Sequence, residues 1–597
     1  MAAAPARKVA LGPADLSVER RADGAILLRS PHRLGEYPAN LTQRLVHWAR
    51  EAPDRTFLAQ RDAHGAWREL SYVEVHARVC AIGQALLDRR LSAERPVAIL
   101  SENDLEHALL ALACLHVGVP YAPVSPAYSL VSTDFGKLRH VLRLLTPGLV
   151  FAADGERFAR AIAAAVPSGT EVLTGADWVR LEATSPTEAV ERAHGGVGPD
   201  TIAKFLLTSG STGQPKAVIN TQRMLCSNQQ MLAQALPSLT EAPPVLVDWL
   251  PWNHTAGGNH NFGLVLYNGG TLYIDDGKPV PGQIEKTARN LRDIAPTIYF
   301  NVPRGYEALL PFLRDDEKLR RTFFSRLGLM QYAGAVLPQP VWKAYEDLAV
   351  QACGERILWL TGYGATETAP AAMFTSRGAA RAGTVGVPVD GLEMKLVPTA
   401  EKLEARFRGP SITPGYWRQP ELTQGAFDEE GYYRTGDALK FLDPADPAQG
   451  LEFDGRTTED FKLTTGTWVS VGPLRARINT AGSPWVQDSV VTGHNRDDVG
   501  ALLFPNPAAC AGLPAAELRA KLQDVFDRLA RESTGSSNRV ARVMLLEEPP
   551  LIDAGEITDK GSINQAAVLK RRAALVEELY AEPASPRVLR AQGGNRR

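Results

Sequence analysis

The chain has 597 residues, with 65 Lys and Arg balanced by 67 Asp and Glu, and this length is too great for one hydrophobic core, so we expect two or more domains. The formal net charge of −2, without a basic tract, argues against binding to nucleic acid or to an anionic membrane through bulk charge. No apolar run reaches the roughly 18 residues of a membrane span, and the N-terminus lacks the apolar region of a signal peptide. The five cysteines are scattered and lack metal-ligand spacing. We therefore expect a cytoplasmic protein with reduced thiols.

The first part of the chain alternates helical and extended patterns. Residues 72–90 carry apolar side chains at helical spacing, and residues 105–117 are apolar on nearly all sides, as in a buried helix. Short extended segments lie at 96–100 and 119–126. This alternation is typical of a parallel sheet with helices on both faces.

The same alternation resumes further along the chain, with predicted strands at 245–250, 271–274, 297–302, 327–332 and 357–360. Each of these segments is followed by Gly, Pro or polar residues. Because parallel strands end at one edge of a sheet, we expect these loops to gather there and to hold the ligand site.

A break rich in turn-forming residues at 441–450 separates this part from a smaller α+β unit. In that unit we predict strands at 486–492 and 540–546 and helices at 513–532 and 563–580. The predicted fold is α/β, with a large N-terminal domain of parallel and mixed sheets with covering helices and a small α+β C-terminal domain. We place the large domain at 1–454, the small domain at 455–582 and a loose tail at 583–597.

The most informative segment is TSGSTGQPK, residues 208–216, which directly follows an apolar strand pattern at 202–207. Its glycines allow backbone N–H groups to approach an anion, its hydroxyls are donors and its lysine is a cation. The predicted phosphate-binding residues are Thr208, Ser209, Gly210, Ser211, Thr212, Gly213 and Lys216. Two other interpretations are a flexible linker and a nucleotide-hydrolase P-loop, but a linker needs no strand before it and the P-loop's Gly-Lys-Ser/Thr is absent.

Four further motifs follow this loop in order: YGATET (363–368), YRTGD (433–437), GRTTEDFKLTTG (455–466) and GEITDKGSIN (555–564). With the loop, they make the chain resemble the adenylate-forming superfamily, which includes acyl-CoA synthetases, luciferases and peptide-synthetase adenylation domains. The resemblance covers residues 208–564. It implies that ATP and a carboxylic acid form an acyl-AMP, and that the small domain is mobile.

The resemblance also implies roles in nucleotide binding. Glu367 is the candidate ligand of Mg²⁺, and Asp437 would accept hydrogen bonds from the two ribose hydroxyls. The other residues assigned to the nucleotide are Thr366 and Arg456 at phosphate or ribose, and Tyr363, Gly364, Gly334 and Ala335 around the base. Read without the resemblance, Glu367 is equally a surface carboxylate after a strand, and Asp437 a turn aspartate after glycine.

The small domain contributes a second lysine and a hinge. By resemblance, Lys560 bridges phosphate and acyl carboxylate, although Asp559 precedes it where many relatives have glycine; the alternative is an exposed lysine at a helix start. Glu459 and Asp460 are the hinge candidates. Residues 465–468 would reach the site in a second conformation.

Residues 248–278 are the predicted acyl pocket, and across nearly the whole chain the closest resemblance is to feruloyl-CoA synthases. It implies an acid–thiol ligase of phenylpropanoid degradation that joins a hydroxycinnamic acid to CoA. His254 would gate the reacting carboxylate, with Trp252 and Gly334 beside it, although aromatic side chains here are equally explained as core. Other functions stay open: a synthetase for benzoates or medium-chain fatty acids, a ligase that loads a carrier protein, or a non-catalytic nucleotide sensor. The oligomeric state, monomer or homodimer, is also open.

The assignment of Lys560 leads to the first prediction. We expect Lys560→Ala to slow adenylation by about 10²–10³-fold, the usual size of one electrostatic contribution in a transition state. The rate of ATP–pyrophosphate exchange measures this step. An exchange rate equal to that of the unmodified protein would refute the role.

Overall fold

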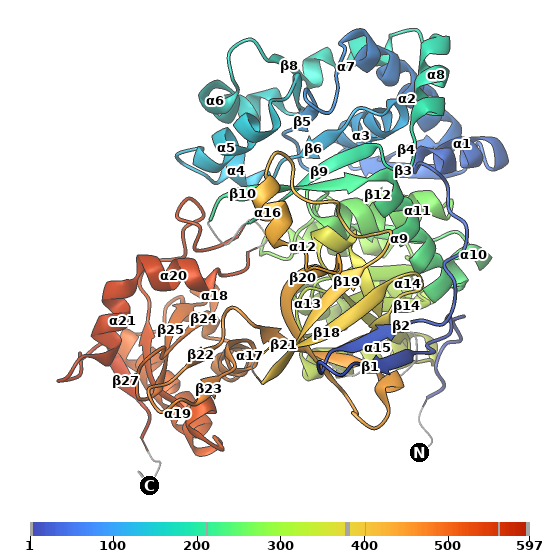
Figure 1. Cartoon of the computed structure of the whole chain (residues 1–597). Helices are drawn as coiled ribbons and strands as arrows, with labels where there is room; N and C mark the ends of the chain where they lie inside the picture. The colour runs from blue at the N-terminus through green and yellow to red at the C-terminus, as the bar shows by residue number, and fades with distance from the viewer. Residues whose placement is uncertain (1–3, 210–212, 376–382, 400, 559–560, 593–597) are drawn as a thin grey trace.

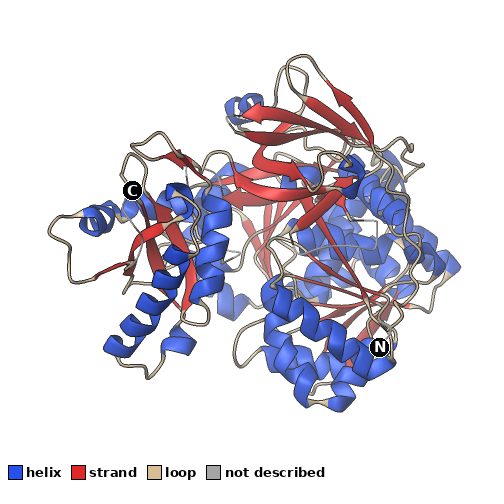
Figure 2. Cartoon of the chain, turned by 90° about the horizontal axis from the view of Figure 1, so that it is seen from below, coloured by secondary structure: helices blue, strands red, loops and turns tan. Residues whose placement is uncertain are grey.

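The computed structural model describes residues 4–209, 213–375, 383–399, 401–558 and 561–592 (Figure 1). Among these residues the strands form five sheets, three in a large domain and two in a small one. Figure 2 shows the small domain as a separate body of helices around a sheet, beside the large domain. The predicted fold class is confirmed. No helix in the described part of the chain is long and apolar enough to cross a bilayer.

One sheet of the large domain carries the predicted parallel core. In order, its strands are β10 (Pro215–Thr221), β9 (Ile202–Ser209), β6 (Tyr121–Pro123), β5 (Val97–Ile99), β7 (Leu149–Ala152) and β8 (Glu171–Thr174). Helices α2 (Tyr72–Asp88) and α3 (Leu105–Val117) pack on one face, and α5 (Gly136–Leu145) and α6 (Gly155–Ala165) on the other. The predicted helix at 105–117 is confirmed, with Asp104 capping its start and Gly118 in the left-handed region at its end.

The other predicted strands of the large domain do not join this sheet. β11 (Val245–Asp248), β12 (Thr271–Ile274), β3 (Thr56–Arg61) and β4 (Trp67–Ser71) form a second one. The third sheet runs β1 (Ser17–Arg20), β2 (Ile26–Arg29), β18 (Glu393–Thr399), β19 (Lys402–Arg408), β20 (Tyr433–Phe441), β21 (Leu451–Arg456), β17 (Thr384–Pro388), β16 (Ala371–Phe374), β15 (Leu358–Gly364), β14 (Leu329–Tyr332), β13 (Ile298–Asn301). The expectation of loops on the edge of one sheet is therefore wrong, and the site draws on strand ends of several sheets.

The two halves of the third sheet differ in character. β13, β14 and β15 are parallel and buried, and they pack on α12 (Ile284–Asp293), α13 (Pro303–Asp315), α14 (Glu317–Ser325) and α15 (Gln339–Cys353). From β15 to β16 and beyond, the pairing is antiparallel. Sequence periodicity detected the parallel half, whose strands are continuous apolar runs, and missed the antiparallel half.

The small domain begins after β21, whose last residue, Arg456, still pairs within the large sheet. Its strands are β22 (Phe461–Lys462) and β23 (Trp468–Val469) in one sheet, and β24 (Val486–Thr492), β25 (Val499–Pro505), β26 (Val540–Leu545) and β27 (Val588–Arg590) in another. Helices α17 (Val471–Gly482) and α19 (Ala515–Arg531) cover one face of the larger sheet, and α20 (Gln565–Arg571) and α21 (Ala573–Tyr580) the other.

Two predictions for the C-terminal part need correction. Within the tail predicted to be loose, Val588–Arg590 form β27, which pairs antiparallel with β26 and buries Val588 and Leu589. The single helix predicted at 563–580 is two helices that meet at Arg572. The Arg572 guanidinium is buried against Glu556 and binds the carbonyls of Glu548 and Pro549, which requires the chain to turn there.

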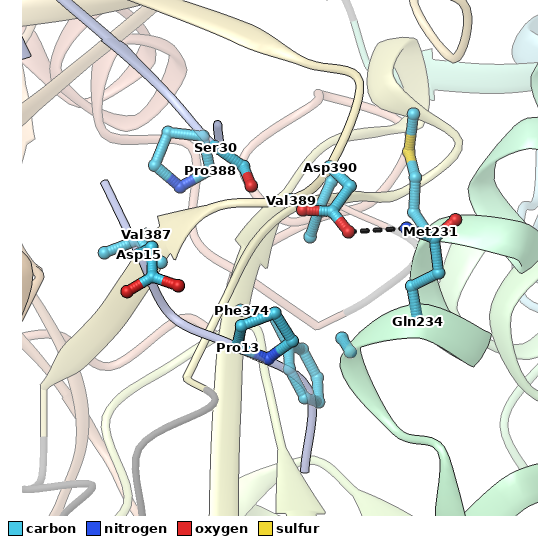
Figure 3. Close-up of a pocket in the computed structure, with 11 residues that line it drawn as sticks. Pro13, Asp15, Ser30, Met231, Gln234, Phe374, Val387, Pro388, Val389 and Asp390 are labelled. Carbon is cyan, nitrogen blue, oxygen red and sulfur yellow. Dashed lines mark hydrogen bonds between the residues drawn. The ribbon is translucent and has the colours of Figure 1, made fainter. Parts of the chain in front are cut away.

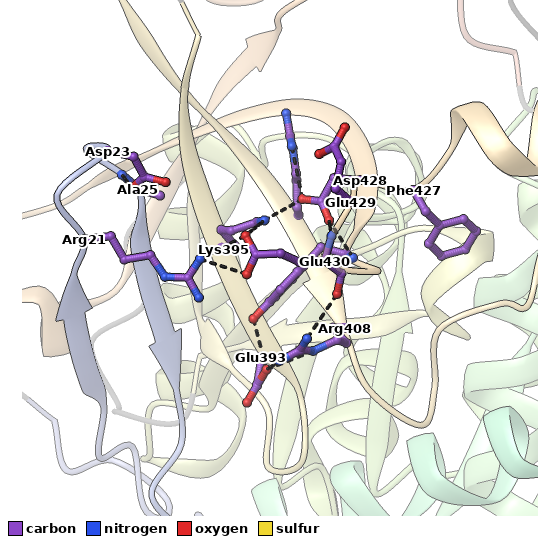
Figure 4. A network of polar contacts seen from close by, with 12 residues as sticks. Arg21, Asp23, Ala25, Glu393, Lys395, Arg408, Phe427, Asp428, Glu429 and Glu430 are labelled. Carbon is purple, nitrogen blue, oxygen red and sulfur yellow. Dashed lines mark hydrogen bonds and ion pairs between the residues drawn. The ribbon is translucent and has the colours of Figure 1, made fainter.

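An ion-pair network ties the N-terminal hairpin, β1 and β2, to the rest of the third sheet (Figure 4). Lys395 Nζ lies 2.6 Å from Asp428 and 2.8 Å from Glu430, and Arg21 reaches Glu430 from the hairpin. Arg406 also pairs with Asp428, whose side chain is fully buried. Burial by itself opposes the charged carboxylate, but hydrogen bonds from Lys395, Tyr432 N–H and Arg406 outweigh it and lower the pKa of Asp428 to about 2.

We predict that Asp428→Asn lowers the stability of the large domain by about 3–5 kcal/mol, because it leaves buried cations without a partner. The folded-state pKa lies below the unfolded value of about 4, so this contribution is complete above pH 4. It is lost as the pH falls toward 2. We would measure the midpoint of unfolding of the parent protein and of Asp428→Asn at each pH. The difference between the two midpoints should become smaller as the pH falls from 4 to 2.

The matched control is Glu430→Gln, which changes a more exposed member of the same network. We expect a much smaller loss, since exposed ion pairs contribute little. Equal midpoints for Asp428→Asn and Glu430→Gln would contradict the assignment.

Candidate active site

The phosphate-binding segment predicted at 208–216 connects the antiparallel strands β9 and β10. Pro215 pairs with Ser209 and Lys216 with Thr208, so the lysine lies opposite the first residue of the motif. Gly213 has φ +82°, a conformation that favours glycine. The predicted binders Gly210, Ser211 and Thr212 lie outside the described residues. The strand register thus holds Lys216 at the base of the turn.

Lys216 takes part in the central contact of the site. Its Nζ lies 2.6 Å from the Tyr416 hydroxyl and 3.3 Å from Glu367 Oε1, and the hydroxyl donates to the same Oε1 at 3.0 Å. Glu367 is buried and Lys216 is partly exposed. Burial and the neighbouring Glu367 charge raise the pKa of Tyr416, so its hydroxyl keeps its proton. Two of these residues were predicted, and Tyr416 was missed.

Glu367 is positioned by a tight turn at the end of β15. Thr366–Thr368 form a short 3-10 helix, and the backbone N–H of Thr413 donates to the carbonyl of Glu367 at 2.9 Å. A Cβ on Gly364 would lie 1.6 Å from the Pro370 carbonyl oxygen, so this position requires glycine. Predicted Thr366 is buried beside Glu367.

A second carboxylate lies on the neighbouring strands. Asp437 on β20 is paired in register with Arg456 on β21, and the Arg456 guanidinium lies 3.3 Å from its Oδ1. Tyr363 donates its hydroxyl to Asp437 Oδ2 at 2.6 Å. Burial raises the pKa of Asp437, against the effect of Arg456. The structure therefore brings together three residues predicted for the nucleotide.

The predicted base-binding residues Gly334 and Ala335 follow β14 in an exposed loop, with Gly334 at φ +85°. Parallel pairing places β14 directly beside β15, which ends in the turn that carries Glu367. The role of these two small residues at the base stays a prediction.

The predicted acyl segment continues from β11 into an unusual helical turn. His254 precedes a π-helical stretch, Ala256–Asn261, that leads into α11 (Phe262–Tyr267). Such turns are frequent at functional sites. The Trp252 ring packs edge-on against His107 and Phe262 and is buried, as its core interpretation requires. The roles of His254 and Trp252 toward a substrate remain predictions.

Buried polar side chains that the sequence reasoning missed hold this turn in place. Lys204 on β9 donates to the Gly258 carbonyl at 2.9 Å, and Gln229 on α9 (Gln222–Ala235) donates to the Asn259 carbonyl at 2.8 Å. Burial lowers the pKa of Lys204 to about 7. A lysine inside the apolar strand pattern at 202–207 was a usable signal, because burying it needs a partner.

One buried amide faces the same turn from β14. Gln331 Nε2 lies 3.3 Å from His260 Nε2, and the His260 ring packs against Phe300. Gln331 Oε1 is buried without a hydrogen-bond partner among the described residues. Buried acceptors are normally paired, so this oxygen is a candidate for contact with a ligand or water.

The small domain contacts the large domain next to the phosphate-loop hairpin. Asp553 Oδ2 accepts from the backbone N–H and the hydroxyl of Thr133, both at 2.9 Å, and Lys137 donates to the Ile552 carbonyl at 2.7 Å. A Cβ on Gly555 would lie 4.0 Å from Gly213 Cα. The predicted catalytic Lys560 lies outside the described residues. The segment that precedes it is nevertheless in contact with the large domain beside the site.

The hinge candidate Asp460 contacts both domains. Its carboxylate lies 2.5 Å from Lys402 Nζ on β19 and accepts from the Val471 N–H at the start of α17 at 2.9 Å. Its side chain is buried. These contacts suit a pivot, and the hinge assignment stays a prediction.

The pocket in Figure 3 lies elsewhere, between the N-terminal segment, α9 and β17. Gln234 donates to Asp390 there at 2.6 Å. None of its lining residues belongs to the predicted site. It is therefore not a candidate for the nucleotide or the acid.

Comparison with known protein families gives two matches. The model described as AMP-binding enzyme matches residues 45–417, and the model described as AMP-binding enzyme C-terminal domain matches residues 460–584. Both lysines, Glu367 and Tyr416 lie within these ranges. Asp437 and Arg456 lie between the two.

Individual relatives agree with these matches. The chain is 32% identical over 318 residues to malonate–CoA ligase of Arabidopsis thaliana, covering 50% of each protein. It is 29% identical over 276 residues to anthranilate–CoA ligase of Pseudomonas aeruginosa, covering 44% of this chain and 48% of that one. The chain spans about half the length of these ligases and less than half of the carboxylic acid reductases that it also matches.

Among solved structures, the A domain of carboxylic acid reductase from Segniliparus rugosus, in complex with AMP and a co-purified carboxylic acid, has a TM-score of 0.71. It is 20% identical, and the match covers 91% of this chain and 94% of that one. At this identity the likeness is one of fold.

The contact of Tyr416 with Lys216 and Glu367 can be tested directly. In Tyr416→Phe, Glu367 Oε1 loses its hydroxyl donor, so Lys216 should pair with the carboxylate more tightly and bind a phosphate less well. Hydrogen bonds to charged groups contribute roughly 1.5–3 kcal/mol, so we expect the Kd for ATP to rise about tenfold or more. Calorimetric titration measures it.

Tyr580→Phe is the matched control, because its hydroxyl is hydrogen-bonded to Thr492 in the small domain, away from the site. Each variant loses one hydroxyl that is hydrogen-bonded in the fold, so each should unfold somewhat below the parent protein and still be folded at the temperature of the titration. If ATP binds equally to the two variants, the hydroxyl has no part in nucleotide binding.

Proposed function

We propose that this chain, which belongs to the AMP-binding enzyme family, is an acid–thiol ligase that activates a hydroxycinnamic acid such as ferulic acid and transfers it to CoA. The observation that carries the proposal is the contact among Lys216, Tyr416 and Glu367 beside the phosphate-loop hairpin. The grouping of Tyr363, Asp437 and Arg456 supports it, because it offers an acceptor for ribose hydroxyls and a cation nearby.

In the proposed first step a carboxylate oxygen of the acid attacks the α-phosphorus of ATP. A new phosphorus–oxygen bond forms, the bond to the bridging oxygen breaks and pyrophosphate leaves. Two anions meet in this step, so cationic charge at the phosphates lowers the barrier. Lys216 is held at the base of the phosphate turn with a carboxylate and a hydroxyl as neighbours, and it would exchange these contacts for phosphate oxygens.

Mg²⁺ is the metal implied for this step, and the donor set fits it. Tyr416 and Lys216 both approach Oε1 of Glu367, so Oε2 takes neither contact and is the oxygen we assign to a hard cation. When bound, Mg²⁺ would neutralise part of the phosphate charge.

In the proposed second step the thiolate of CoA attacks the carbonyl carbon of the acyl-AMP and AMP leaves. The step needs no nucleophile from the protein. The five cysteines, all in the described part of the chain, form no disulfide, and burial raises the pKa of the thiols of Cys80, Cys114 and Cys226. Thiols with a raised pKa are poor nucleophiles, in agreement with direct attack by CoA.

For the acid, the support comes from the acyl region. A flat aryl acid suits a mainly apolar slot with few polar groups. We assign Gln331 Oε1 to the ring hydroxyl, because this acceptor is buried and unpaired among the described residues. The CoA ligase relatives act on malonate and on anthranilate, so the family includes both aliphatic and aromatic acids.

The second candidate function is activation of an acid for a carrier protein or for reduction, which the likeness to carboxylic acid reductases favours. It shares the first step and differs in the acceptor. A non-catalytic nucleotide sensor fits less well, because it would not need Lys216 and Glu367 poised together.

The test supplies ATP, CoA and one acid at a time without any carrier: cinnamates, benzoates, C6–C12 fatty acids, malonate or anthranilate. We expect thioester absorbance, AMP and pyrophosphate to be largest with ferulate, p-coumarate or caffeate. Gln331→Leu should lower kcat/KM for p-coumarate relative to unsubstituted cinnamate at least about tenfold, the cost of leaving one polar group unpaired. Gln230→Leu, on α9, is the matched control.

The other outcomes separate the alternatives. Turnover of fatty acids alone would overturn the hydroxycinnamate assignment and leave the two-step chemistry standing. Pyrophosphate release without thioester would favour a carrier acceptor. Tight ATP binding without pyrophosphate release, with every acid, would refute the enzyme.

A further inference from the structure

A cluster of metal-binding side chains lies outside the proposed active site, where three helices of the large domain meet. His76 and Cys80 are one turn apart on α2, and His116 is near the end of α3. One ligand atom from each of the three lies within 4.8 Å of the others. Figure 1 shows α2, α3 and α8 (Glu188–Gly196) together, and the helices are in contact.

The spacing is close to that of a tetrahedral metal centre. Cys80 Sγ lies 3.6 Å from His76 Nε2 and 4.0 Å from His116 Nε2. Metal–ligand bonds of 2.0–2.3 Å at tetrahedral angles put ligand atoms about 3.3–3.8 Å apart. Small side-chain adjustments would therefore bring all three atoms to bonding distance of one ion.

The surroundings also lack the partners that buried imidazoles normally have. His116 is buried, and its Nδ1 has no hydrogen-bond partner among the described residues, nor has the buried Nδ1 of His194 on α8. The His194 ring stacks on His116 with centroids 4.0 Å apart. Glu191 lies one helical turn before His194 on the same helix.

The sequence shows why this cluster escapes a motif search. His76 and Cys80 are four residues apart, which places them on one face of a helix, but His116 comes 36 residues later. The positions of the three residues along the chain therefore do not match the spacing of a known zinc motif. The cluster forms because α3 packs against α2 in the folded domain.

We propose that His76, Cys80 and His116 form a tetrahedral Zn²⁺ site, with water in the fourth position. One thiolate and two imidazoles are ligands that zinc binds in structural sites. Binding forms one Zn–S and two Zn–N bonds and releases the thiol proton to solvent. The site joins α2 to α3, so the ion would stabilise the helical layer rather than take part in the acyl transfer.

The experiment uses the full chain without a histidine tag, treated with a chelator and then titrated with Co²⁺ as the spectroscopic probe. We expect one equivalent per chain, with a thiolate-to-cobalt charge-transfer band and the intense visible bands of a tetrahedral ion, both abolished by Zn²⁺. Zn²⁺ should also raise the temperature of unfolding.

Cys80→Ser and His116→Asn should each weaken Co²⁺ binding at least about 100-fold, the upper range seen for disturbed metal sites. Cys353→Ser, at another partly buried cysteine, and His64→Asn, at an exposed histidine, should bind like the parent. ATP binding shows that each variant is folded, and His76→Asn, at a less buried position, serves if the others fail to fold.

A Co²⁺ spectrum without the thiolate band would overturn the proposal. Equal binding by Cys80→Ser and Cys353→Ser would do so as well and would mean adventitious binding to surface histidines. No binding at all would leave Cys80 and the two imidazoles as a hydrogen-bonded cluster and refute the zinc site.

Discussion

The site depends on a buried carboxylate, Glu367, that has to be compensated by groups from elsewhere in the chain. An unpaired buried charge is strongly unfavourable, so the fold is stable only if a cation and a donor reach it. Lys216 arrives from β10 and Tyr416 from a segment 200 residues later. That segment is attached to β10, since Trp417 N–H donates to Ala217 O and Ile219 N–H to Gly415 O. The same hydrogen bonds therefore hold the phosphate turn and the carboxylate together.

The second carboxylate follows the same rule on a neighbouring pair of strands. Asp437 and Arg456 are partners in the antiparallel register, and Tyr363 comes from β15 of the same sheet. A slip of one residue would turn each side chain to the opposite face and leave Asp437 buried without a cation. The register that pairs these strands is therefore also the one that brings the carboxylate and the cation together. This explains why the predicted nucleotide residues lie close in space although they come from separate motifs.

The sequence predicted what local patterns determine. The buried helix at 105–117 and the strands at 271–274 and 486–492 agree with the structure to the residue, because local residue preferences and the residues that flank each element define its ends. The division into three sheets was not predictable, since it depends on contacts between distant strands. Tyr416 was missed for the same reason, because the residues around it give no sign of its contact with Lys216, 200 residues earlier in the chain. The break at Arg572 depends on a buried partner, Glu556, that helical periodicity does not report.

The contacts of the 551–558 loop are stronger within the small domain than with the large domain. Glu556 is fully buried against Arg572 and Arg571 in the small domain, and removing a partner from such a pair costs about 3–5 kcal/mol. The contacts of the same loop with the large domain, at Thr133 and Lys137, are partly exposed hydrogen bonds of roughly 0.5–1.5 kcal/mol each. If the domains separate, they therefore part between the loop and the large domain, and the loop stays with the small domain. In the predicted movement of the small domain, the 551–558 loop would therefore stay with that domain, and Asp460, paired with Lys402, is the hinge candidate that contacts both domains.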